Sequence, residues 1–162
     1  MPLISVGAVR HNRCIARRRS GFSMLEMLIV MIVMGILAKI AVQKIERVTR
    51  HERVNRAAQV LVQDLQNGFA MAGRQRAPVR LTFTTSTKTY VFTDRATGTV
   101  LQTRVMSTGA DYSLTSMSTT ATTVDILPNG IGSTAFTVTL TNGDYSRTVV
   151  ATTAGFVRST PQ

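Results

Sequence analysis

The sequence contains few of the residues on which disulfide-bonded, metal-binding and many catalytic proteins depend. Its 162 residues include one cysteine, two histidines, no tryptophan and four prolines. One cysteine excludes a disulfide framework within the chain and any cysteine-rich zinc site. The same inventory leaves little material for nucleophilic or metal-assisted catalysis. A chain of this length can fold as one domain of ordinary size without disulfides.

Acidic residues are also scarce, since 8 Asp and Glu stand against 19 Lys and Arg and leave a formal charge of +11. Clustered Lys and Arg are the usual electrostatic footprint of phosphate binding, so this charge raises the possibility of nucleic-acid binding. Residues 1–21 carry five arginines and no acid, residues 22–80 carry nine basic against four acidic residues, and residues 81–162 carry five against four. The C-terminal half is nearly neutral, which weakens that interpretation.

A long apolar run occupies residues 22–42 and is interrupted only by Glu26 near its start and Lys39 near its end. At a helical rise of ~1.5 Å per residue, the run covers about 30 Å, the thickness of one hydrocarbon core. Apolar residues occupy every side of this helix, which favours a transmembrane segment over a buried core helix. A secretory signal peptide is the alternative, but the run is longer than usual and residues 38–41 offer no convincing cleavage site.

Basic residues flank the apolar run on both sides, so the charge pattern leaves its orientation open. Five of them lie within residues 44–56, just beyond the run. Anionic lipid headgroups attract basic residues at such positions. A solvated helix face is an equally good interpretation of this segment.

The helix is predicted to continue beyond the run with one apolar face. No proline occurs between Pro2 and Pro78, and apolar residues recur every 3 or 4 positions with charged residues on the opposite face. The apolar stripe comprises Val54, Ala58, Leu61, Leu65, Phe69 and Ala72. We expect one helix from about Ser23 to about Ala72, ending near Gly73, with residues 22–42 in the membrane and residues 43–77 as an amphipathic stem.

Residues 78–162 show the period-two alternation of Thr and Val that is typical of strands. Strands are predicted at residues 79–84, 88–93, 99–106, 122–127, 135–141, 145–152 and 156–158. Turn signals at residues 94–98, 128–130 and 142–143 separate several of them. Closely spaced strands with short turns predict an antiparallel sheet. Residues 107–123, rich in Ser and Thr, are expected to form a mobile loop.

The junction between the basic leader and the apolar run reads RRRSGFSMLE over residues 17–26. This resembles the class III signal of type IV pilins and type II secretion pseudopilins. The resemblance implies that a prepilin peptidase cuts between Gly21 and Phe22 on the cytoplasmic side and methylates the new amino terminus of Phe22. It also implies a single-pass protein of the bacterial inner membrane with its C-terminal head in the periplasm, and residues 1–21 as a cleaved leader.

Glu26 is a functional candidate on physical grounds, because a carboxylate in a lipid-facing helix costs about 2–3 kcal/mol. Its position matches the glutamate that the pilin-like family keeps at the fifth mature residue. The resemblance implies a salt bridge between Glu26 and the Phe22 amino group of a neighbouring subunit, and such pairing would offset the desolvation of both groups. The alternative is a glutamate that reaches toward the membrane surface.

The head resembles the GspH/FimT group of minor pseudopilins and minor pilins through its alternating strands and the closing segments at residues 140–150 and 155–158. Some FimT-like proteins contact DNA through a terminal Gly-Arg-x-Arg segment. Here Phe156 replaces the first arginine, which leaves Arg158 as a weak candidate DNA contact. Two departures, Gln43 where family members often have proline and the deep position of Lys39, indicate a less kinked stem and a minor subunit.

These observations predict an α+β fold in which a long N-terminal helix packs on an antiparallel β-sheet head. If residues 1–21 are removed, His51 is the one histidine left and no cysteine remains, so we expect no catalytic residues, no metal site and no cofactor. The four aspartates of the head lie in or beside turns and strands, where structural roles are expected.

The predicted function is that of a minor pseudopilin of a type II secretion system, acting in the tip or initiation complex. The alternative is a FimT-like minor type IV pilin in pilus biogenesis or DNA uptake. Expected partners are other pilins or pseudopilins, the prepilin peptidase and the inner membrane. Nucleic acid, bound through the head, is a partner only in the DNA-uptake alternative. A membrane-tethered β-domain that resembles prepilins by accident is a third hypothesis.

Overall fold

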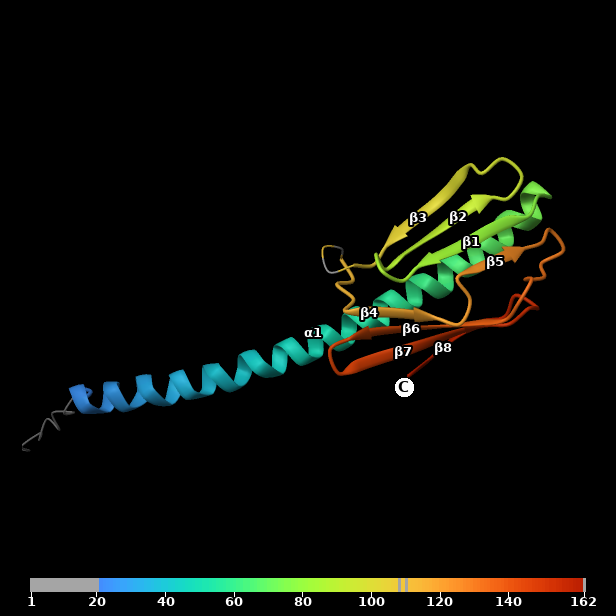
Figure 1. Ribbon diagram of the computed structural model, residues 1–162. Helices are drawn as coiled ribbons and strands as arrows, with labels where there is room; N and C mark the ends of the chain where they lie inside the picture. Colours follow the sequence, from blue (N-terminus) through green and yellow to red (C-terminus); the bar gives the residue numbers. More distant parts are fainter. Residues whose placement is uncertain (1–20, 108, 110, 162) are drawn as a thin grey trace, which may run out of the picture. The chain divides into compact units, whose positions relative to one another are not determined.

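The computed structural model describes residues 21–107, 109 and 111–161. Helix α1 (Met24–Gln75) runs for 52 residues and is followed by strands, as labelled in Figure 1. The strands are β1 (Val79–Thr84), β2 (Thr89–Asp94), β3 (Val100–Val105), β4 (Ser116–Thr119), β5 (Thr123–Ile126), β6 (Phe136–Asn142), β7 (Tyr145–Ala151) and β8 (Val157–Pro161). The predicted leader, apart from Gly21, lies outside the described residues.

The chain divides into two compact units, Met1–Ile40 and Ala41–Gln162. In the described part of the chain, the first unit contains the apolar beginning of α1, and the second contains the rest of α1 and the strands. The predicted long helix and strand-rich head are therefore confirmed.

The strands form two antiparallel sheets of four strands each, where the sequence pattern predicted one sheet. The first has the order β3-β2-β1-β5 and the second the order β4-β6-β7-β8. The chain changes sheet three times, between β3 and β4, between β4 and β5, and between β5 and β6. Alternation of side chains identifies strands but does not specify which strand edges pair.

The stretch of residues 107–123, predicted to be a mobile loop, contains a strand and core residues instead. Strand β4 pairs antiparallel with β6, and Met117 lies opposite Leu140. Leu114 is fully buried and Met117 is 5% exposed. The prediction was wrong because Ser and Thr dominate the segment, while the two apolar residues that anchor it are too few to produce a pattern.

The other strands match their predicted bounds to within one residue, except that β8 extends to Pro161.

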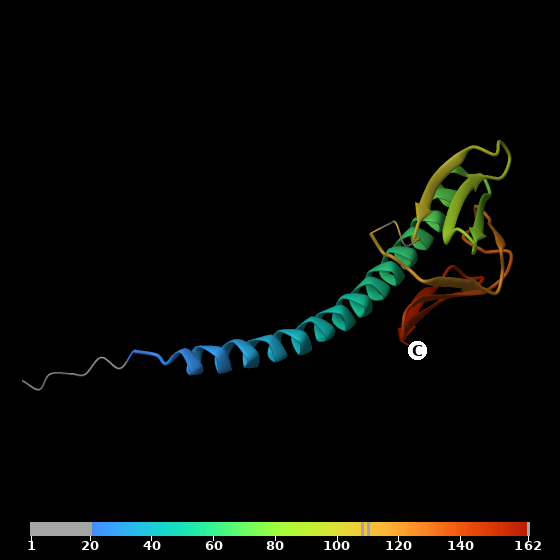
Figure 2. The same ribbon diagram turned by 60° about the vertical axis from the view of Figure 1, so that its left-hand side comes forward.

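The predicted apolar stripe of the stem forms the helical part of the core. Val54, Ala58, Leu61, Leu65 and Ala72 are each no more than 1% exposed, and Phe69 is partly buried. Figure 2 shows both sheets on the same side of this part of α1. Burial of one leucine side chain contributes about 1.5–3 kcal/mol, so the stripe fixes which face of α1 meets the sheets.

Aromatic rings connect the two sheets. The ring of Phe83 on β1 lies 5.6 Å from the ring of Phe136 on β6 and 6.0 Å from the ring of Tyr90 on β2, measured between ring centroids. Tyr90 in turn makes an edge-to-face contact with Phe92. Such aromatic pairs add about 0.5–1.5 kcal/mol beyond their buried area.

Helix α1 ends close to the predicted position, but a different residue terminates it. Gly73 remains helical, and the left-handed conformation is taken by Arg76, whose φ is 51°. A left-handed residue after the last helical turn is a common helix terminus. Pro78 follows two residues later and prevents the helix from resuming.

Gly68 provides a test of how tightly α1 packs on the first sheet. A Cβ at Gly68 would lie 2.5 Å from Cε1 of the buried Phe92 ring, whereas a Cβ at Gly73 would meet only the Pro128 carbonyl oxygen at 3.8 Å. We expect Gly68→Ala to lower the free energy of unfolding by about 1–2 kcal/mol, because overpacking outweighs the gain in helix propensity. Gly73→Ala should be neutral or slightly stabilising. Urea unfolding of a fragment comprising residues 41–162 measures both, and equal stability of the two variants would contradict the packing.

Candidate assembly segment

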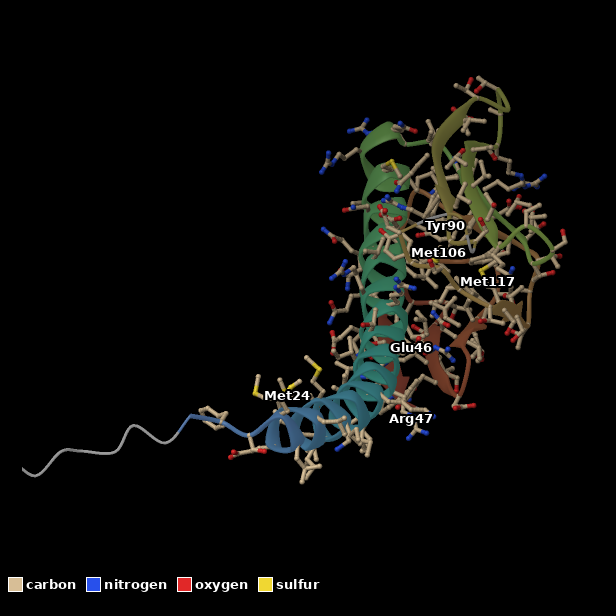
Figure 3. All side chains as sticks on the ribbon, turned by 90° about the vertical axis from the view of Figure 1, so that its left-hand side faces the viewer. Met24, Glu46, Arg47, Tyr90, Met106 and Met117 are labelled. Atoms are coloured by element: carbon tan, nitrogen blue, oxygen red, sulfur yellow. The ribbon has the colours of Figure 1, made fainter. Side chains whose placement is uncertain are left out.

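The beginning of α1 exposes apolar side chains on all sides. Every large apolar side chain within residues 22–40 is at least 48% exposed. Figure 3 shows Met24 and its neighbours projecting outward around the first turns. The helix is long and apolar enough to cross a membrane, and its most apolar window has no buried residues in the structure. An apolar surface of this size marks a site of contact with lipid or with other proteins.

Three predicted site residues lie together at the start of this segment. Gly21 has no heavy atom within 4 Å of the position that a Cβ would occupy, and Phe22 is 77% exposed. Glu26 lies in the first turn of α1, which begins with the hydrogen bond from Met27 N to Ser23 O. A carboxylate in the first turn interacts favourably with the helix dipole. Glu26 is the one acidic residue within residues 22–45.

Asp64 forms a buried ion pair that the sequence pattern did not predict. It lies on the apolar face of α1 and is 4% exposed. Its carboxylate accepts hydrogen bonds from the Tyr90 hydroxyl at 2.7 Å and from Nε and Nη2 of Arg104 at 2.9 and 3.1 Å. These bonds connect α1 to β2 and β3, and Figure 3 shows Tyr90 beside the helix.

The hydrogen bonds keep this carboxylate ionised. Burial by itself would raise the pKa of Asp64, but hydrogen bonds from Arg104, Tyr90 and Gln102 outweigh it and lower the pKa below its ordinary value. Burial and the bond to Asp64 raise the pKa of Tyr90, and the bond to Asp64 raises the pKa of Arg104. The expectation that charges lie opposite the apolar stripe is therefore wrong at Asp64. Its spacing from Leu61 and Leu65 was the available signal, since it places all three on one face.

A second charged cluster joins the strands β1 and β5. Nε and Nη2 of Arg80 donate to the two carboxylate oxygens of Asp125 at 2.8 and 3.1 Å, and Arg95 Nε lies 3.5 Å from Oδ2. Arg80 and Asp125 are direct cross-strand partners. The hydrogen bond from Arg80 lowers the pKa of Asp125 against the opposing effect of burial. Asp125 thus has the structural role expected of the head aspartates.

Arg158 lies at the start of β8, opposite Val150, and is exposed. Arg147, the other arginine within the strands of this sheet, is three residues from Val150 along β7 and so faces the opposite side. The structure therefore does not join these two cations into one patch. Phe156, which replaces the first arginine of the DNA-contact segment, is 64% exposed.

A family model described as type II transport protein GspH matches residues 57–155. The chain belongs to this family. A second model, described as the prokaryotic N-terminal methylation motif, matches residues 16–41 and spans Gly21, Phe22 and Glu26. The predicted membership of the GspH/FimT group is thereby confirmed.

Solved structures of two minor filament subunits share the fold of this GspH-family chain. The minor pseudopilin EpsH from the type 2 secretion system of Vibrio cholerae is 17% identical, with a TM-score of 0.56 over 67% of this chain and 97% of that chain. The type IV minor pilin FimU of Pseudomonas aeruginosa is 19% identical, with a TM-score of 0.56 over 70% of this chain and 92% of that chain. A search of curated proteins gives no match.

The family and the fold are those of structural pseudopilins and pilins. Among residues 21–107, 109 and 111–161, no three or more His, Cys, Asp or Glu side chains gather where they could hold a metal ion. The exposed apolar helix and its attachment to the head are the features of the described residues that fit such a subunit.

Asp64→Asn tests the attachment of α1 to the head. The substitution leaves Arg104 without its counter-ion, and because the Arg104 side chain is 36% exposed we expect a loss of only about 1–3 kcal/mol in the free energy of unfolding. Because the pKa of Asp64 is lower in the folded state, its ionised carboxylate stabilises the fold at every pH above the unfolded-state pKa of about 3.9. This contribution disappears as the pH falls through the folded-state pKa. Unfolding measured from pH 7 to pH 3 should show a smaller acid destabilisation in the variant than in the wild type.

The exposed Asp111 provides the control for this measurement. Asp111→Asn removes the same charge without touching the ion pair, so its stability and its pH dependence should follow the wild type. An unchanged pH profile in Asp64→Asn would contradict the role assigned to Asp64.

Proposed function

We propose that this GspH-family chain is a minor pseudopilin that joins the tip or initiation complex of a type II secretion pseudopilus through its N-terminal helix. The observation that carries the proposal is the apolar helix, exposed on all sides and continuous with a stem that is anchored in a GspH-like head. Neighbouring helices of the same kind would cover the apolar surface on assembly. The protein acts by packing and has no catalytic activity of its own in this proposal.

We propose that maturation removes residues 1–21 by cleavage between Gly21 and Phe22 and methylates the amino group of Phe22. The match to the methylation motif over residues 16–41 supports this proposal. The open surroundings of Gly21 and the exposure of Phe22 also support it, because a peptidase must reach the peptide bond between them. Residues 22–42 would then anchor the mature chain in the inner membrane, residues 43–77 would form the stem, and residues 78–162 would lie in the periplasm.

We propose that Glu26 directs assembly by pairing with the Phe22 amino group of a neighbouring subunit. Both groups lie at the start of the exposed apolar helix. In a medium of low dielectric constant, an unpaired carboxylate and an unpaired ammonium are each costly, and bringing them together offsets both costs. The pairing therefore favours one axial alignment of adjacent helices over others.

Glu26→Ala tests this role. We expect the variant to enter the membrane and to start at a methylated Phe22 like the wild type, but to be incorporated into filaments at least about tenfold less. Mass spectrometry of the N terminus and immunoblotting of sheared filaments provide the two readouts. Glu52→Ala, which removes a carboxylate from the stem beyond the apolar run, should assemble normally. Normal incorporation of Glu26→Ala would refute the proposed pairing.

A minor type IV pilin is the second candidate function, and the fold shared with FimU is the observation that favours it. If a minor type IV pilin acts in DNA uptake, its head binds DNA. Since phosphate contacts need several cations and give a strong salt dependence, the near-neutral head argues against it.

Gel-shift assays with duplex DNA and a fragment comprising residues 41–162 separate these functions. Because the fragment includes the basic stem, we expect a weak salt-dependent shift that is the same in the wild type and in Arg158→Ala. A salt-dependent shift that Arg158→Ala removes would establish the DNA-uptake function in place of the secretion one.

A further inference from the structure

A groove of about 320 Å³ lies where the stem meets the turn between β6 and β7. Its lining comprises Glu46, Arg47, Arg50, Asp144 and Tyr145. Figure 3 shows Glu46 and Arg47 projecting from α1 at the level of this turn. All five residues belong to the second compact unit, Ala41–Gln162.

The sequence of the turn makes room for the groove. Gly143 has a φ of 61°, a left-handed conformation that favours glycine. A Cβ at Gly143 would lie 3.1 Å from Nη1 of Arg50, so glycine allows the arginine to lie against the turn. On the other side, the ring of Tyr145 makes an edge-to-face contact with the His51 ring at a centroid distance of 5.2 Å. These contacts hold Arg50 and Tyr145 in place, and Nη2 of Arg50 also lies 3.6 Å from Oε2 of Glu46, beyond hydrogen-bond distance.

The charges of the groove match a ligand that carries one group of each sign. The guanidinium groups of Arg47 and Arg50 can donate to phosphate oxygens in the paired geometry that arginine favours. The carboxylates of Glu46 and Asp144 can accept the N–H bonds of a primary ammonium, and the face of Tyr145 attracts a cation. Two arginines and two acids leave the lining with no net charge, which fits a zwitterion better than an anion.

The position of the groove along the chain brings it close to such a ligand. Glu46 follows Val42, the last residue of the proposed span, by four residues, or about 6 Å at the rise of an α-helix. If residues 22–42 cross the membrane, as the proposed function requires, Glu46 and Arg50 lie in the headgroup layer that borders the hydrocarbon core.

We propose that this groove binds the phosphoethanolamine headgroup of a membrane lipid while the subunit resides in the membrane. The inference rests on the proposed membrane anchoring of the chain. It differs from attraction of anionic lipid by the basic stem, because that attraction uses the arginines alone and is opposed by Glu46 and Asp144. The two carboxylates therefore decide between these forms of lipid binding.

The experiment uses the full chain, reconstituted in vesicles of equal parts phosphatidylethanolamine, phosphatidylcholine and phosphatidylglycerol and re-extracted with mild detergent. The lipids retained by the protein are quantified by mass spectrometry. We expect phosphatidylethanolamine to be enriched about fivefold over phosphatidylcholine, whose quaternary ammonium cannot donate hydrogen bonds to carboxylates. Equal retention of these two lipids would overturn the inference.

Glu46→Gln and Asp144→Asn should abolish this enrichment, whereas Glu52→Gln should preserve it. Glu52 is a matched control, because its side chain is 64% exposed against 63% for Glu46, and it does not line the groove. Each of these substitutions makes the chain more positive. If the basic stem merely attracted anionic lipid, all three variants would retain more phosphatidylglycerol, and the enrichment in phosphatidylethanolamine would be absent from the start.

Two competition experiments identify the part of the lipid headgroup that the groove recognises. Soluble phosphoethanolamine should displace the bound lipid, and inorganic phosphate at the same concentration should not. Equal displacement by both would show that the carboxylates are not used and would overturn the inference. A chain that fails to enter vesicles would contradict the membrane anchoring itself, whereas insertion without lipid preference would contradict the groove alone.

Discussion

Helix α1 has two parts whose surfaces require different environments. The beginning of α1 presents apolar side chains in every direction, and the stem presents one buried stripe toward the sheets. An apolar surface on all sides is stable only in lipid or among other helices, while a single stripe is what a folded head can cover. The division of the chain into two units agrees with this requirement.

The attachment of the stem to the head combines apolar contacts with one buried ion pair. Apolar stripes on a helix and a sheet tolerate small sliding or rotation, because hydrophobic contact has little directional preference. The bonds from Tyr90 and Arg104 to Asp64 are directional, so they fix the rotation of α1 against β2 and β3.

Much of the architecture was predictable because it depends on local patterns. The uninterrupted apolar run, the spacing of Leu61 and Leu65, and the alternation along β6 each follow from the period of one element, and the structure contains the elements that they predict. Residues 17–26 predicted the family without any structural knowledge, and the match over residues 16–41 agrees with that prediction.

The features that the sequence did not predict depend on residues far apart in the chain. The partner of Asp64 is Arg104, forty residues away, and nothing local indicates that they meet. Strand β4 was missed because its anchor, Met117, is isolated among Ser and Thr, and the number of sheets was missed because pairing between strands is not encoded in alternation. The groove beside Arg50 likewise requires the β6–β7 turn to reach the stem.

The exchange of strands between the two sheets also constrains the order in which the head can fold. Strand β1 pairs on one side with β2, its neighbour in sequence, and on the other with β5, so that Val79 lies opposite Ile126. The edge of β1 therefore stays open until the chain through β5 is available, and contacts between such distant residues form slowly. If the head leaves the cytoplasm as an unfolded chain, this open edge is a transient aggregation hazard that lasts until β5 arrives. Strand β4 can pair only after the later strand β6 has been translocated. The head therefore completes its core only when most of its residues have left the cytoplasm.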